Sequence, residues 1–462
     1  MRLKSGTIEI PQEDIYQNDK LSRQKSVSNL AKLLRNVQSP LVFSVNGPWG
    51  AGKTTYMKML NSTLSNAGAK SIYFSAWETD FAEDPLIAFI GEMNAALEKY
   101  ILGDVEKNRA WGIAKAAGVH ILKRSFPVGI KVATAGLLDW DKVYEDEASK
   151  LAEALTKDAI DNYSKSKEAI ALFKSNIAKV LASGDGTPGK MFIFVDELDR
   201  CRPTYAIELL ERVKHLLDVE GLVFILAMDK SQLAHSVKAV YGTEFDALGY
   251  LKRFIDVEFT LPRADPMDFV ESLLSKLELD SYFAARTFSA ETKNDRDNLL
   301  EMLRVVTQKM SLRDIEQLVS KVKLVSLTID TQQSFHIVFI MFLIIAKDQH
   351  PEVYRNFAQD GSTVNDITLL INLIFSGEKL LWTRQYLEGM IIASTMHGMR
   401  DWAQSRIEAL KTIYHSDNQS PADKENAGRI LEVVDQNLRM GRGLPVATFL
   451  ERIDMLSEFV FE

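Results

Sequence analysis

The chain has 462 residues with 46% hydrophobic and 26% charged side chains, which is ordinary for a globular protein of roughly two to four domains. The formal net charge of -8 argues against a protein that coats nucleic acid broadly, so nucleic acid is not indicated as a partner. A single cysteine, Cys201, excludes an internal disulfide framework. Together with the lack of an apolar signal segment, it suggests the cytoplasm.

Short apolar runs alternate with helical patterns in the first half of the chain. After a helical pattern at about residues 25–37, the runs are Leu41–Val45, Ser71–Ala76, Met191–Val195, Leu222–Ala227 and Asp256–Thr260. Buried parallel strands have this length and composition, and crossover helices join them. The pattern therefore predicts an α/β fold with a parallel five-stranded core sheet.

A long helical stretch separates the second run from the third, which predicts a helical insertion at about residues 90–190. Within it, residues 111–140 are moderately apolar, but basic residues such as Lys115 and Lys131 interrupt them. We interpret this segment as a helical hairpin. An amphipathic element on a membrane surface is the alternative, so peripheral membrane contact stays open.

Strand signals fade beyond Pro262, and the remainder carries helical patterns. We expect a core domain over residues 1–262, a helical lid over 263–330 and a helical C-terminal domain over 331–462. The longest apolar run, Phe335–Ala346, is far shorter than the roughly 20 residues that a spanning helix needs, so an integral membrane protein is not expected.

The strongest chemical signal follows the first apolar run. It is the phosphate-binding Walker A pattern, for which we expect contacts from Gly47, Pro48, Trp49, Gly50, Ala51, Gly52, Lys53, Thr54 and Thr55. Glycines let the backbone close around phosphate oxygens, and the next helix directs its positive end at the same anion. Lys53 is expected to reach the β and γ phosphates, and the Thr54 hydroxyl to ligate Mg²⁺.

A second motif ends the third apolar run with the acids Asp196 and Glu197. An apolar strand that ends in an acid is the Walker B arrangement, in which Asp196 would hold the Mg²⁺ shell. A second acid suits a hydrolase, because the attacking water must be polarised. Glu197 is therefore the candidate general base.

The residues at the end of the fourth apolar run indicate whether the nucleotide is GTP or ATP. Guanine specificity normally needs Asn-Lys-x-Asp after a late strand, whereas this chain has Ala227-Met228-Asp229-Lys230. We therefore expect ATP. Asp229 is either a sensor of the γ phosphate or a helix cap before Ser231, and the sequence leaves both open.

Taken together, these motifs resemble the KAP family of P-loop NTPases, which belongs to the additional-strand class. The resemblance covers roughly residues 10–325 and rests on ordered motifs at Asn46–Thr55, Phe74–Glu78 with Asp84–Ile87, Val195–Pro203, and Tyr250–Phe254 through Phe259–Pro262. It implies an extra strand between the strands that bear the Walker motifs. The chain departs from the family in lacking a clean membrane span in its insertion, and in Ser75, where asparagine is common.

Three arginines are candidates for stabilising the charge of the transition state. Arg253, in the closing motif, is the one assigned a catalytic role, on its own nucleotide or a neighbour's. Arg200 either does this or pairs with Asp199 or another carboxylate. Arg313 opens a helix of the expected lid, where a surface ion pair is the alternative.

These motifs predict a magnesium-dependent ATPase that acts as a conformational switch. The KAP resemblance implies bacterial phage defence or signalling as its setting, which is an analogy of family alone. A small-molecule kinase and a nucleotide-gated scaffold with little turnover are the alternatives. A protein partner, or a second copy of the chain, is expected to bind through the helical regions.

Overall fold

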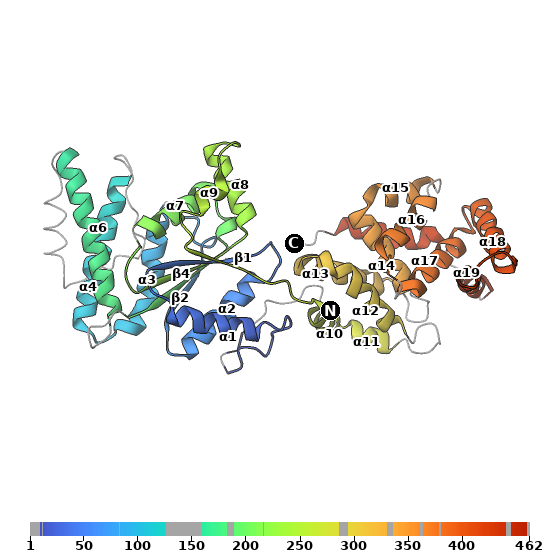
Figure 1. The fold of residues 1–462 in the computed structure, drawn as a ribbon, viewed down its shortest axis with the longest axis horizontal. Coiled ribbons are helices and arrows are strands. Elements are labelled where there is room, and N and C mark those ends of the chain that lie inside the picture. The colour runs from blue at the N-terminus through green and yellow to red at the C-terminus, as the bar shows by residue number, and fades with distance from the viewer. Residues whose placement is uncertain are drawn as a thin grey trace. The chain divides into compact units, whose positions relative to one another are not determined.

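The structure is a computed structural model that describes residues 10–459, except 12, 83, 126–158, 183–188, 216, 286–293, 330–335, 361–363, 378–379 and 440–444. The chain forms two compact units, one over Ile8–Arg263 and one that contains Ala264–Glu462 (Figure 1). Most of the second half of the predicted hairpin, at residues 126–140, lies outside the described residues.

The first unit is built on one five-stranded sheet, in the order β2-β3-β4-β1-β5. Its strands are β1 (Leu41–Asn46), β2 (Lys70–Ser75), β3 (Met191–Asp196), β4 (Leu222–Met228) and β5 (Val257–Thr260). All neighbouring strands are parallel. The predicted fold class is confirmed, because the five apolar runs are the five strands. The strand β4 lies between β1 and β3, as the KAP resemblance implied.

Helices cover both faces of this sheet, and Figure 1 shows α1 and α2 on one side and α7, α8 and α9 on the other. The alternation of side chains along each strand explains this arrangement. Phe43 and Val45 of β1 pack with α1 and α2, whereas Val42 packs with the helices of the opposite face. The elements are α1 (Gln24–Asn36), α2 (Lys53–Asn66), α3 (Pro85–Ile101), η1 (Leu198–Arg200), α7 (Pro203–His215), α8 (Lys230–Tyr241) and α9 (Ala247–Leu251).

The insertion between β2 and β3 is helical in its described part. It contains α4 (Val105–Ser125) and α6 (Ala159–Leu181), which pack against each other beyond α3 (Figure 1). Gly118 allows close packing here, since a Cβ at that position would lie 2.6 Å from Ile90 Cδ1. The insertion therefore adds a helical layer to one face of the unit.

The second unit is helical over its described residues. Its elements are α10 (Met267–Lys276), α11 (Leu279–Ala284), α12 (Asp295–Val306), η2 (Thr307–Lys309), α13 (Leu312–Leu327), α14 (Ile337–Gln349), α15 (Pro351–Asp360), α16 (Val364–Ile374), α17 (Leu381–Thr395), α18 (Arg400–His415), α19 (Pro421–Arg439), α20 (Val446–Asp454) and η4 (Met455–Glu458). Because α14 packs against both α12 and α13, helices on either side of the expected boundary at 330 share contacts. The separate lid and C-terminal domain stay a prediction.

The apolar run that the sequence singled out forms α14, and its side chains from Ile337 to Ala346 are buried in this unit. Protein packing, rather than lipid, therefore accounts for its hydrophobic character. Across the described parts of the chain, no helix is long and apolar enough to cross a bilayer.

Candidate functional site

The Walker A residues form the loop between β1 and α2. Gly50 and Gly52 have φ angles of 72° and 79°, in the left-handed region that favours glycine. No side chain caps α2, whose first residue is Lys53, so the first N–H groups of the helix face the loop. At Gly47, a Cβ would lie 3.4 Å from Leu261 Cβ, at the lower limit of ordinary van der Waals contact. The loop therefore fits a phosphate chain.

Lys53 folds back onto this loop. Its Nζ donates to the carbonyl oxygens of Gly47 and Pro48 over 2.7 Å and 3.2 Å, and lies 3.8 Å from Asp199 Oδ2. Burial lowers the pKa of Lys53, while nearby carboxylates, Asp199 foremost, oppose that shift. The ammonium group of Lys53 is thus held beside the phosphate loop, where phosphate oxygens could replace the two carbonyl oxygens as its acceptors.

Asp199 joins the loop to the neighbouring strand end. Its Oδ2 accepts from Trp49 Nε1 over 2.6 Å and from the backbone N–H of Asp229 over 2.9 Å. The carboxylate is only 2% exposed. Trp49 therefore braces the phosphate loop through Asp199. Sequence reasoning assigned no functional role to Asp199, although its place after the Walker B acids was a usable signal.

The metal candidates are Thr54, in the first turn of α2, and Asp196, at the buried end of β3. Asp196 accepts from the Tyr73 hydroxyl over 2.6 Å and from the backbone N–H of Glu197 over 2.8 Å. Burial and the Asp196 charge raise the pKa of Tyr73 far above its usual range, so this hydroxyl stays a donor. A hydroxyl and a carboxylate suit Mg²⁺, which prefers oxygen ligands.

Glu197 follows β3 with a left-handed backbone, at φ 61° and ψ 27°. Ser75 Oγ donates to its Oε2 over 2.7 Å, and Arg200 NH1 lies 2.6 Å from its Oε1. The Arg200 guanidinium also lies 6.0 Å from the centroid of the Trp77 ring. The sequence named Asp199 or another carboxylate as the partner of Arg200, and in the structure that partner is Glu197.

Arg23, just before α1, supports the Walker A loop from behind. Its NH1 donates to Gly52 O over 3.1 Å and its NH2 to Ala51 O over 2.8 Å. The residue is only 6% exposed, and burial lowers the pKa of its guanidinium. No local sequence pattern marks Arg23, and sequence reasoning missed it.

The remaining candidates lie elsewhere. Asp229 caps α8, because its Oδ1 accepts from the N–H groups of Ser231 and Gln232 over 3.1 Å and 3.3 Å.

The side chain of Arg253 is exposed in the turn between α9 and β5. Among the described residues it makes no hydrogen bond or ion pair with the Walker A loop. Arg313 is exposed in the first turn of α13, and Cys201 is buried with its thiol pKa raised by desolvation.

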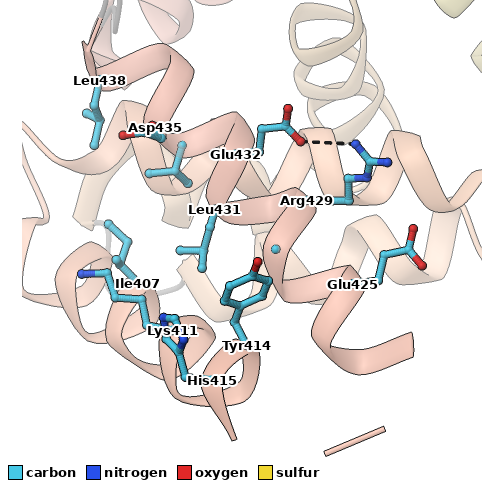
Figure 2. Close-up of a pocket in the computed structure, with 12 residues that line it drawn as sticks. Ile407, Lys411, Tyr414, His415, Glu425, Arg429, Leu431, Glu432, Asp435 and Leu438 are labelled. Atoms are coloured by element: carbon cyan, nitrogen blue, oxygen red, sulfur yellow. Dashed lines mark hydrogen bonds and ion pairs between the residues drawn. The ribbon is translucent and has the colours of Figure 1, made fainter. Parts of the chain in front are cut away.

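The second unit holds a hollow of its own, between α18 and α19, with a volume of about 1020 Å³ (Figure 2). Basic Lys411 and Arg429 face it together with acidic Glu425 and Glu432. Arg429 and Glu432 pair with each other at 3.3 Å. Because the lining mixes both signs of charge, it does not select a ligand of one sign.

The model of the KAP family P-loop domain matches residues 23–329. The "Phage T7 exclusion protein" of Escherichia coli (strain K12) is 23% identical over 261 residues, which are 51% of this chain and 32% of that protein. The chain thus aligns with about a third of this relative.

Among solved structures, the Aeropyrum pernix ORC1 protein in complex with DNA matches 91% of this chain and 84% of its own, at 12% identity. The TM-score is 0.30, which is too low for the two arrangements to be compared residue by residue.

Proposed function

The chain belongs to the KAP family of P-loop NTPases, and we propose that it is a magnesium-dependent ATPase that uses hydrolysis as a conformational switch. The observation that carries the proposal is the meeting of the Walker A lysine with a carboxylate just after the Walker B acids, where Lys53 Nζ lies 3.8 Å from Asp199 Oδ2. Glycine-rich loops and acids placed in this way bind a triphosphate and act on its terminal phosphate.

In this proposal Lys53 exchanges its carbonyl partners for the β and γ phosphates, and the N–H groups of the loop hold the phosphate oxygens. Thr54 and Asp196 would hold Mg²⁺, which neutralises phosphate charge when bound. Glu197 orients the attacking water and accepts its proton. Arg253 remains the candidate arginine for the transition state, either in its own site or in that of a second copy.

ATP is proposed because the residues at the place of the guanine-recognition motif have a different, structural role. After β4 the chain reads Asp229-Lys230, and Asp229 caps α8 through the N–H groups of Ser231 and Gln232. A carboxylate that accepts these N–H groups is not arranged to read a guanine edge.

The fate of the γ phosphate tests the proposal. With γ-labelled ATP, the wild type should release inorganic phosphate, and Lys53→Ala should release none above background. Label found on an organic acceptor would support a small-molecule kinase instead. Tight ATP binding without release of label would support the nucleotide-gated scaffold, which the engaged carboxylate of Glu197 favours as the second candidate.

A role in bacterial phage defence is proposed from the relative named for phage T7 exclusion. Expression of the chain in Escherichia coli should lower the plating efficiency of phage T7, and Lys53→Ala should restore it. Equal plating with both chains would contradict this role. The cytoplasm is the proposed location, since the single cysteine, Cys201, is buried as a thiol.

We also propose that a protein partner, or a second copy of this chain, binds through the helical regions. The hollow between α18 and α19 is the first surface to substitute, because its volume of about 1020 Å³ leaves room for side chains of a partner. Capture by the Glu197→Gln variant with ATP bound, followed by Tyr414→Ala in this hollow, would show whether the partner needs it.

A further inference from the structure

Glu197 is engaged on both carboxylate oxygens. Ser75 Oγ donates to Oε2 over 2.7 Å, and Arg200 NH1 lies 2.6 Å from Oε1. A carboxylate that must orient a water needs an oxygen aimed at that water. Here both oxygens of Glu197 are instead held by donors of the protein itself, which fix the direction of the side chain.

Neither donor to Glu197 belongs to the phosphate loop. Ser75 ends β2, the edge strand next to β3, whereas the loop follows β1 on the far side of β4. The acid that approaches Lys53 is Asp199, at 3.8 Å. Glu197 is therefore held by Ser75 and Arg200, while a different carboxylate, that of Asp199, lies beside the phosphate-binding lysine.

The backbone builds this arrangement locally. Glu197 adopts φ 61° and ψ 27°, a conformation that costs free energy in any residue with a side chain. The short helix η1 starts at the next residue and ends at Arg200, which places the guanidinium back over Glu197. The pair is therefore a product of the turn itself and needs no distant element.

The ion pair between Arg200 and Glu197 lies near the surface, where it can break. The Arg200 side chain is 40% exposed, and the Trp77 ring beside it is 54% exposed. The Glu197 side chain is 19% exposed, so the pair is only partly screened, but water can solvate the guanidinium group once it leaves. Arg200 can leave Glu197 without unfolding any part of the core.

We propose that Arg200 is a positioning residue that holds Glu197 in a non-productive direction and so restrains ATP hydrolysis until the contact opens. This inference rests on the proposed function, since it needs Glu197 to be the base. It differs from a transition-state role for Arg200 in the sign of the expected effect.

The first test compares Arg200→Ala with Arg202→Ala. Arg202 is the matched control, because it pairs with Asp80 at 2.8 Å in the same region. Arg200→Ala should raise kcat for phosphate release roughly two- to tenfold with KM unchanged, which is the range of one modest hydrogen bond. Arg202→Ala should leave kcat unchanged. An unchanged or lower kcat in Arg200→Ala overturns the proposal, and a loss of about 10³-fold or more would assign Arg200 to the transition state.

A second test needs neither nucleotide nor turnover. Carbodiimide with glycine ethyl ester modifies accessible carboxyl groups, and peptide mass spectrometry reads the rate at Glu197. That rate should rise at least about twofold in Arg200→Ala, since one donor is lost, and stay constant in Arg202→Ala. An equal rate in all three proteins overturns the contact.

Two further variants separate this proposal from the proposed function. Trp77→Leu should raise kcat in the same direction but less, and it serves if Arg200→Ala does not fold. Adding Glu197→Gln to Arg200→Ala should abolish the gain. If Glu197→Gln alone leaves hydrolysis unchanged, the base assignment fails, and Arg200 then restrains nothing. If Glu197→Gln abolishes hydrolysis while Arg200→Ala gives no gain, only the restraint fails.

Discussion

The two units of the molecule use charged side chains differently. In the unit Ile8–Arg263, the buried carboxylate of Asp199 accepts from Trp49 and from the backbone of Asp229, and lies near Lys53. In the helical unit, Arg406 meets Glu388 across a partly exposed helix surface at 2.5 Å. Removing the partner of a buried charge costs free energy, because the charge is left without its hydrogen bond. Breaking an exposed ion pair costs little, because water replaces the lost contact. The comparison indicates that a buried carboxylate braces the phosphate loop of the first unit, whereas this ion pair of the second unit lies at a partly exposed surface.

The largest effect should come from the shared carboxylate. Asp199→Ala leaves the backbone N–H of Asp229 without its acceptor, so we expect a loss of ~1–3 kcal/mol in the free energy of unfolding. Weaker ATP binding should accompany it, because Trp49 loses its brace. Urea unfolding and titration with a fluorescent ATP analogue measure the two effects.

Asp199→Asn is the matched control. Its amide oxygen can accept both N–H groups, so only the charge is lost and the free energy of unfolding should fall by under about 1 kcal/mol. If alanine and asparagine are equally destabilising, the charge rather than the hydrogen bonds holds this part of the site.

Packing sets the next effect, in the helical unit. A Cβ added at Gly389 of α17 would lie 2.7 Å from Val433 Cβ on α19. Gly389→Ala should therefore cost ~1–3 kcal/mol in the free energy of unfolding, which outweighs the better helix propensity of alanine. Gly398→Ala is the control, because a Cβ there meets nothing within 4 Å. Thermal unfolding should show lower stability for Gly389→Ala but not for Gly398→Ala. Titration with ATP should show unchanged affinity for both variants.

The smallest effect should be that of an exposed pair. Arg406→Ala removes the contact with Glu388, but the Arg406 side chain is 38% exposed. The expected loss in the free energy of unfolding is ~0–1 kcal/mol, and it should shrink further at high salt. A loss as large as that of Asp199→Ala would erase the contrast between the two units.

The sequence predicted the parts of the site that act on one ligand. Lys53, Thr54, Asp196 and Glu197 were predicted because phosphate and Mg²⁺ need those groups at the carboxyl ends of parallel strands. Strand runs were equally clear, since buried parallel strands are short and apolar. Their order was not, because spacing along the chain does not say which strands are neighbours.

Contacts between distant residues could not be predicted. Arg23, just before α1, donates to Ala51 and Gly52, just before α2, and no local sequence pattern marks such a contact. The partner of Arg200 depended on the left-handed turn at Glu197, which sequence patterns give only for glycine or asparagine. In the helical unit, amphipathic periodicity predicted helices but not the hollow between α18 and α19, because that hollow depends on how the helices pack.

The most direct test of ATP hydrolysis by Glu197 is a single-turnover measurement with Glu197→Gln. ATP should bind to this variant with near wild-type affinity, since Glu197 contacts Ser75 and Arg200 rather than the phosphate loop. Phosphate release should then fall by about 10²–10⁴-fold, the usual contribution of a general base. Release at the wild-type rate with ATP bound would contradict the account.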